Sequence, residues 1–269
     1  SVKDQINSDV RDIFSTAGAF AALKNDGSVI TWGISYTGGD SSAVSSKLIS
    51  GVEKIITGEW FISAIKTGGE LVVWGHVNQA SLNSALSSNI TDVASNSRHA
   101  LALKSDGNIV TIARDGWADP FPTHIPESEL GSINSVLGGH QGLAVLNDDG
   151  NMLWWNFDTY IKPFPSGISK VFASKFPSCF VAHKPDGTLY SWCMYSGLKN
   201  IVQSIADVDN IVTSGRGFAV LKNDGSLVSW DYDSSSYSLS YFTESPTSNV
   251  QSVYSNYRAF AAIKTDGSA

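Results

Sequence analysis

The stretch Phe20-Ala-Ala-Leu-Lys-Asn-Asp-Gly-Ser-Val-Ile-Thr-Trp32-Gly33 decides the fold, because versions of it recur along the whole chain. It returns as Ile62-Ser-Ala-Ile-Lys-Thr-Gly-Gly-Glu-Leu-Val-Val-Trp74-Gly75, then at 100–113, 143–156, 180–193 and 218–231, with a shortened copy at 260–269. Seven copies that keep the same register predict a repeat architecture.

One glycine marks the same position in every copy: Gly27, Gly69, Gly107, Gly150, Gly187, Gly225 and Gly267. Each glycine ends a short polar loop between two runs of β-branched, aromatic or small residues. Such a loop predicts a three-residue β-hairpin in which glycine adopts a positive φ. An apolar anchor follows five residues later in six copies: Trp32, Trp74, Ile112, Trp155, Trp192 and Trp230.

Composition agrees with a turn-rich β protein. The 269 residues are 42% hydrophobic and 16% charged, and they include 24 glycines, which favours a packed domain with many turns over a helical bundle. The net charge of −7 argues against a protein that binds nucleic acid by neutralising phosphates. No apolar run reaches the roughly 18–20 residues that a membrane-spanning helix needs.

The repeat length predicts the fold class. A repeat of about 40–45 residues with about four strands is typical of a propeller blade. We therefore expect an all-β, seven-bladed β-propeller without helices, as a single domain over residues 1–269. The expected repeats are 10–51, 52–89, 90–132, 133–167, 168–207, 208–249 and 250–269.

The last copy stops just after its turn, so we expect an incomplete last blade, with residues 1–9 closing it. Either the chain is a fragment of a longer repeat protein, or it tolerates a short seventh blade with an exposed edge.

The copies resemble a known family. A motif of the form V-x-x-I followed by A-L-K-x-D-G-x-V-x-x-W-G resembles RCC1-type repeats, and most closely the short bacterial repeats of BLIP-II-type (β-lactamase inhibitory protein II-like) propellers. The resemblance covers about residues 10–269. It implies a seven-bladed propeller that binds a protein partner, with no cofactor and no catalysis, at a bacterial cell surface or outside the cell.

The loops between the first and second strand of each copy vary while the scaffold repeats. Equivalent loops of a propeller lie on one rim of one face, and exposed Trp, Tyr and Arg are frequent anchors of protein interfaces. In the BLIP-II-type family these loops carry aromatic contacts, and Gly58-Glu59-Trp60-Phe61 is similar to that pattern. The expected partner-binding residues are Glu59, Trp60, Phe61, Arg98, His99, His140, Gln141, Phe176, Arg216, Tyr257 and Arg258. The alternative is that the aromatic side chains only pack over the blade ends.

Aromatic insertions after the anchors form a second candidate surface, although we expect most of them to cover outer strands. They include Trp117, Phe121, Tyr232, Tyr237, Tyr241 and Phe242.

Catalytic and metal motifs are absent from the sequence. The five histidines are spread over four copies without ligand spacing, although His99 and His140 stand in neighbouring loops. The aspartates before the turn glycines are explained by turn chemistry. We therefore expect no enzyme, no cofactor and no metal site.

The expected function is a monomeric, non-enzymatic binding ring for an unidentified protein, as an interaction or inhibitor module or as part of a larger secreted repeat protein or toxin. A carbohydrate-binding lectin is the alternative, although a lectin with one sugar per blade should repeat its pocket residues.

Two cysteines flank the fifth hairpin. If Lys184 pairs with Thr188, the same register places Cys179 opposite Cys193, with Cα atoms about 4.5–5.5 Å apart, within disulfide reach. The pair is therefore either a disulfide or two buried thiols.

Overall fold

The computed structural model describes two compact units, Ser1–Val136 and Leu137–Ala269, which are considered one at a time. The described residues are 2–78, 82, 86–97, 99–114, 131–139, 142–155, 160–161, 166–173, 179–193, 203–205, 207–214, 217–233, 238–242, 248–255 and 259–269. Over these ranges, no helix is long and apolar enough to span a bilayer.

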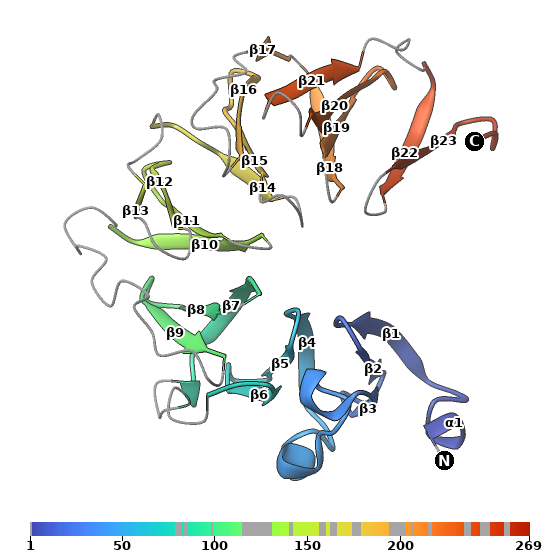
Figure 1. Ribbon diagram of the computed structural model, residues 1–269, viewed down its shortest axis with the longest axis vertical. Coiled ribbons are helices and arrows are strands. Elements are labelled where there is room, and N and C mark those ends of the chain that lie inside the picture. Colours follow the sequence, from blue (N-terminus) through green and yellow to red (C-terminus); the bar gives the residue numbers. More distant parts are fainter. Residues whose placement is uncertain are drawn as a thin grey trace. The chain divides into compact units, whose positions relative to one another are not determined.

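The first unit contains three antiparallel sheets, each built from one repeat (Figure 1). The first sheet comprises β1 (Val10–Ser15), β2 (Ala19–Lys24) and β3 (Val29–Gly33). The second comprises β4 (Val52–Thr57), β5 (Phe61–Lys66) and β6 (Leu71–Gly75). The third comprises β7 (Ile90–Ser95), β8 (His99–Lys104) and β9 (Ile109–Ala113).

Three sheets of four strands continue the series along the chain (Figure 1). They are β10 (Ile133–Gly138), β11 (Leu143–Asn147), β12 (Met152–Trp155) and β13 (Tyr160–Ile161); β14 (Lys170–Ala173), β15 (Cys179–His183), β16 (Thr188–Cys193) and β17 (Gln203–Ser204); and β18 (Val208–Thr213), β19 (Gly217–Lys222), β20 (Leu227–Asp233) and β21 (Ser238–Phe242). In the described part of the chain, the last sheet has two strands, β22 (Val250–Ser255) and β23 (Phe260–Lys264), so the expectation of an incomplete last blade is confirmed.

Helical structure is minor, although we expected none. One helical turn, α1 (Val2–Gln5), contacts β3, and two 3-10 segments, η1 (Ser35–Thr37) and η2 (Ser42–Lys47), follow that strand. Closure of the last repeat by residues 1–9 and the single-domain boundary stay predictions.

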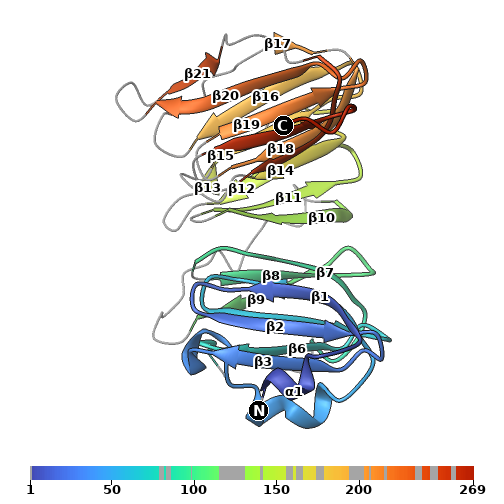
Figure 2. The same cartoon turned by 90° about the vertical axis from the view of Figure 1, so that its right-hand side faces the viewer.

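Within each unit, the core lies between successive sheets. Figure 2 shows the strands β1, β2 and β3 running side by side. The face of this sheet that carries Ala21 and Leu23 packs against Ile62 and Trp74 of the next sheet, and all four side chains are buried. Because both faces of the middle strands are covered, strands such as β5 are apolar without the alternation of a half-exposed strand. This explains the continuous apolar runs in the sequence.

The turn glycines link one repeat to the next. All seven have the predicted positive φ, between 73° and 84°. The carbonyl of Gly69 accepts a hydrogen bond from the N–H of Ile90 (2.9 Å), at the start of the following repeat. The same bond joins Gly27 to Val52, Gly150 to Ile168, Gly187 to Ile205 and Gly225 to Val250.

A second left-handed residue, which we did not predict, precedes the first strand of most repeats. It is Asp9, Gly51, Asn89, Gly167, Asp207 or Asn249, with φ between 61° and 82°. The carbonyl of Asn89 accepts from the N–H of Ser105 (2.8 Å) in the neighbouring hairpin turn. Asp, Asn and Gly are the residues that adopt this conformation most readily, so their recurrence before a β-branched residue was a usable sequence signal.

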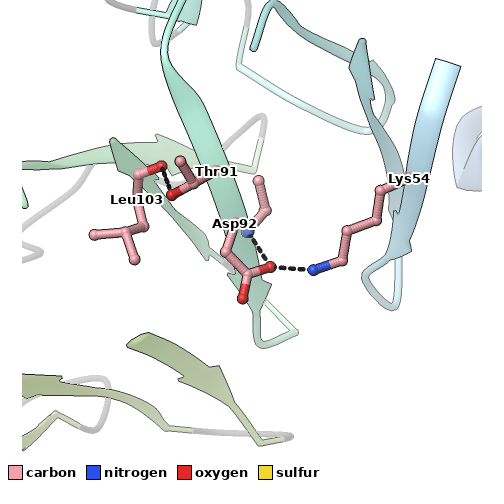
Figure 3. Close-up of polar contacts among 5 residues, drawn as sticks. Lys54, Thr91, Asp92 and Leu103 are labelled. Atoms are coloured by element: carbon pink, nitrogen blue, oxygen red, sulfur yellow. Dashed lines mark hydrogen bonds and ion pairs between the residues drawn. The ribbon is translucent and has the colours of Figure 1, made fainter. Parts of the chain in front are cut away.

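The first strands of neighbouring sheets contact one another, as β4 does with β7. A bulge near the start of these strands is followed by exposed polar side chains, and Lys54 reaches Asp92 of the next sheet (Nζ to Oδ1 2.5 Å) (Figure 3). Both side chains are substantially exposed, so this ion pair contributes little stability.

The strand register places Cys179 opposite Cys193, as predicted. The N–H of Lys184 donates to the carbonyl of Thr188 across the turn. Hydrogen-bonded and non-hydrogen-bonded pairs alternate along the two strands from there, so Cys179 and Cys193 form a non-hydrogen-bonded pair, in which opposed residues approach most closely. A disulfide between the two stays a prediction.

Replacing Gly107 with valine should lower the free energy of unfolding by about 1–3 kcal/mol, because a β-branched residue is strained at φ +82°. Gly107→Asn provides the control, since it adds the same Cβ but tolerates this φ better. Urea denaturation of both variants measures the difference. Equal losses would show that crowding and not φ matters at this turn.

The turn aspartates should make stability depend on acidic pH. The Ser226 hydroxyl and N–H donate to Asp224 Oδ1 (2.5 and 2.9 Å), which holds the pKa of Asp224 below its usual value. Hydrogen bonds from the residue two positions later lower the pKa in the same direction for Asp26, Asp106, Asp186 and Asp266.

A carboxylate whose pKa is lowered by folding stabilises the folded protein at pH values above its unfolded-state pKa. That stabilisation is lost as the pH falls through the folded-state pKa. The free energy of unfolding should therefore decrease between about pH 5 and about pH 2. A triple variant with Asp106→Asn, Asp186→Asn and Asp224→Asn should show a smaller decrease in urea titrations at several pH values. An unchanged pH dependence would assign it to other carboxylates.

Candidate functional site

The glycine after each anchor tryptophan brings two segments together. Gly75 has φ +105°, and a Cβ there would lie 2.8 Å from the carbonyl oxygen of Trp60. The chain therefore turns back onto the loop before β5, and the N–H of His76 donates to that carbonyl (3.0 Å). Ile34 and Gly18 repeat this contact in the first sheet (2.8 Å). In these two sheets, the two candidate surfaces that we considered separately are one surface.

Four side chains from three successive sheets meet at this place. The ring of Tyr36 stacks on Trp60 (centroids 6.0 Å apart, interplanar angle 18°) and meets His76 edge-on (6.3 Å). The Arg114 guanidinium lies 4.4 Å from the centroid of Trp60. We call Tyr36, Trp60, His76 and Arg114 the rim cluster.

The Arg114 guanidinium is held from two sides. Its Nε donates to His76 Nδ1 (3.2 Å), a bond that requires the Nδ1 lone pair of the neutral imidazole. Its terminal nitrogens have no recorded partner within the described part of the chain, and they form the fork that binds a carboxylate in bidentate fashion. A cation–π contact contributes about 0.5–1 kcal/mol at an exposed site. The cluster is therefore an ordered, partly exposed anchor with a positive end.

Backbone contacts fix the position of the cluster. The carbonyl of Glu59 accepts from the N–H of Ala17 in the equivalent loop of the first sheet (3.2 Å). The buried indole of Trp74 donates to the carbonyl of Gly38 (2.9 Å), which ties the segment that carries Tyr36 to the second sheet. Tyr36 itself is 54% exposed, so a partner can reach the cluster.

Of the residues expected to bind a partner, Trp60 joins the rim cluster and Glu59 is half-buried beside it. Phe61 and His99 are 1% and 7% exposed because each begins the middle strand of its sheet. They offer no surface for contact, and we no longer include them among the contact residues. The others lie outside the described residues: Arg98, His140, Gln141, Phe176, Arg216, Tyr257 and Arg258.

Tyr36, His76 and Arg114 were missed because we read the segments after the anchors mainly as covers for outer strands. That reading fits β21, which pairs with β20 as a fourth strand. His76 and Arg114 each stand two residues after an anchor position, Trp74 and Ile112. The signal was the glycine after Trp74, which reverses the chain toward the variable loop.

No metal-binding group is found beside the rim cluster among the residues that the structure describes. In the portions of the chain that are described, no group of three or more His, Cys, Asp or Glu side chains could hold a metal ion. The turn aspartates bind their own turns, as Asp106 does with the N–H of Asn108 (3.0 Å). The chemistry that the cluster offers is apolar stacking and carboxylate binding.

Two tryptophans of the second sheet should respond differently to truncation. Trp74→Ala should lower the free energy of unfolding by about 3–5 kcal/mol, because Trp74 is 3% exposed in the core. Trp60→Ala should cost about 1 kcal/mol or less, because its ring lies half-buried at the rim. Urea denaturation measures both, and a loss at Trp60 as large as that at Trp74 would make Trp60 a core residue.

Comparison with known proteins identifies the fold. No protein-family model and no curated protein match the chain. Among solved structures, Prp20p from Saccharomyces cerevisiae is similar with a TM-score of 0.58 and 13% identity, over 97% of this chain and 84% of Prp20p. Human WBSCR16 is similar with a TM-score of 0.52 and 18% identity, over 95% of this chain and 72% of that one.

A second structure of yeast RCC1 (Prp20) is similar with a TM-score of 0.51 and 14% identity, over 86% of this chain and 71% of RCC1. At these identities the likeness concerns the fold alone. Together with seven small antiparallel sheets in the described residues, it shows that the chain is an all-β, RCC1-like β-propeller with an incomplete last blade.

Proposed function

We propose that this chain is a non-enzymatic module that binds a protein partner through the rim cluster. The observation that carries the proposal is the stack of Tyr36, Trp60 and Arg114, which combines aromatic area, partial exposure and a guanidinium held in place. Aromatic and arginine side chains that are ordered before binding lose little conformational entropy on association.

Among the seven equivalent loop positions of the sequence, tryptophan occurs only at Trp60. The residues equivalent to Trp60 are Gly18, Arg98, Gln141, Ser178, Arg216 and Arg258. A lectin with one sugar per blade would repeat its pocket, whereas a single cluster suits one asymmetric partner. The solved structures of similar fold support the same class of function, since Prp20p was studied for binding to Gsp1p and histones and yeast RCC1 was solved bound to Kap60.

The finer assignments are part of this proposal. The module acts as an inhibitor or as part of a larger secreted repeat protein or toxin, outside a bacterial cell or on its surface. It is monomeric, and with its net charge of −7 it does not bind nucleic acid.

Trp60→Ala and Arg114→Ala should each weaken binding of the partner by more than about 1–2 kcal/mol while the fold stays intact. The partner is first isolated by affinity capture from the native source, and the affinities are then measured by calorimetry. Lys54→Ala is the control, because Lys54 is exposed near the opposite end of β4.

Unchanged affinity in both rim variants, with circular dichroism like that of the wild type, would overturn the proposed surface. Saturable binding of one sugar on a glycan array would favour the lectin.

A further inference from the structure

His76 and Arg114 occupy the same position in successive repeats. Each stands two residues after an anchor, Trp74 or Ile112. At the equivalent position, the other repeats that contain an anchor carry Ile34, Phe157, Met194 and Tyr232. An imidazole and a guanidinium therefore follow the anchors of neighbouring repeats at this one place in the sequence.

Backbone hydrogen bonds fix the main chain around both residues. The N–H of His76 donates to the carbonyl of Trp60 (3.0 Å). Two residues later, the N–H of Asn78 donates to the carbonyl of Ala113 (2.8 Å), the residue that directly precedes Arg114. Ala113 is buried. The two side chains therefore start from main-chain positions that are tied to each other.

The hydrogen bond between the two side chains has only one possible direction. The Nε of Arg114 lies 3.2 Å from the Nδ1 of His76. A guanidinium has donors and no acceptor, so the imidazole must accept through the lone pair of Nδ1. The imidazole is therefore neutral in this arrangement and carries its proton on Nε2.

This bond also determines where the guanidinium lies. The Nε contact fixes the end of a long side chain that otherwise has many rotamers, and the guanidinium then lies 4.4 Å from the ring centroid of Trp60. A cation–π contact at a partly exposed site is weak by itself. Tyr36 supports the arrangement from another side, since its ring stacks on Trp60 and meets the His76 ring edge-on.

We propose that His76 is a positioning residue for partner binding: its neutral imidazole holds the Arg114 guanidinium over Trp60, and its protonation releases the arginine and weakens binding. This proposal rests on the proposed function, because it describes the regulation of the same site. The rim cluster is then organised at neutral pH and loses its organisation in an acidic medium.

Protonation reverses the contact between His76 and Arg114 for two reasons. A protonated Nδ1 is a donor, so it cannot accept the Nε–H of the guanidinium. The imidazolium and the guanidinium also carry like charges at short distance, and like charges repel.

Other titratable groups near His76 do not restore this contact. In the described part of the chain, the elements packed against His76 carry two further titratable side chains, Tyr36 on η1 and Glu59 in the loop before β5. A carboxylate at Glu59 favours the imidazolium, but it does not supply the acceptor that Arg114 loses.

The sign of the pH dependence follows from the neutral form being the one that binds. An arginine that is held before binding loses less conformational entropy on association than a released one. Histidine side chains change charge between about pH 8 and about pH 5. The affinity for the partner should therefore be full above this range and decrease as the pH falls through it.

Nitrogen-15 NMR of the protein alone tests the geometry. The ring signals of His76 are identified by their loss in His76→Asn. At about pH 8 we expect a ring protonated on Nε2 and not on Nδ1, with nuclear Overhauser effects between the side chains of Arg114 and Trp60 that disappear near pH 5. A ring protonated on Nδ1 at about pH 8, or Overhauser effects that persist after the ring is protonated, would overturn the proposal.

Two variants separate the acceptor of His76 from its charge. His76→Asn places Oδ1 near the position of Nδ1 and cannot be protonated, so its affinity for the partner isolated from the native source should stay within about threefold of the wild type at pH 7.5 and change little at pH 5.5. His76→Ala removes the acceptor and should weaken binding about tenfold at pH 7.5. The wild type should weaken about tenfold between the two pH values.

Trp60→Ala distinguishes this proposal from the proposed function. If Trp60→Ala binds weakly while the affinity of the wild type falls with pH no more than that of His76→Asn, the role of His76 is overturned and the proposed function stands. If Trp60→Ala and Arg114→Ala both bind like the wild type, the proposed function is overturned and this regulation with it.

Discussion

The structure depends on a hairpin turn that only a left-handed residue can make without strain. At Gly69, the positive φ places the turn carbonyl against the first residue of the next repeat, Ile90, with which it forms a hydrogen bond. A Cβ on Gly69 would lie 2.7 Å from the backbone nitrogen of Asn89. The turn therefore needs glycine for two reasons, its positive φ and the close approach of the next repeat. The same link recurs in both units.

This constraint explains why the fold could be predicted and part of the site could not. The hairpins, their register and the short last sheet follow from local signals, namely the glycine position and the apolar runs beside it. The burial of Phe61 was not evident, because an aromatic residue at a loop boundary can point outward or into the core. It faces inward here, since it begins β5 and packs among Ile65 and Val73.

The rim cluster was harder to predict because its members come from different repeats. Trp60 was visible as a tryptophan in a variable loop, whereas Tyr36 and Arg114 belong to segments that differ from repeat to repeat. Their contact depends on the turn at Gly75 and on the bond from Trp74 to Gly38, both of which are tertiary features.

Photo-crosslinking from single positions tests most directly the claim that a uniform scaffold presents one unique contact surface. Tyr36 and Tyr254 are both exposed tyrosines, 54% and 58%, and each is replaced in turn by p-benzoylphenylalanine. We predict that the partner is crosslinked from position 36 and not from position 254. Crosslinking from position 254 alone, with both variants folded, would contradict the account.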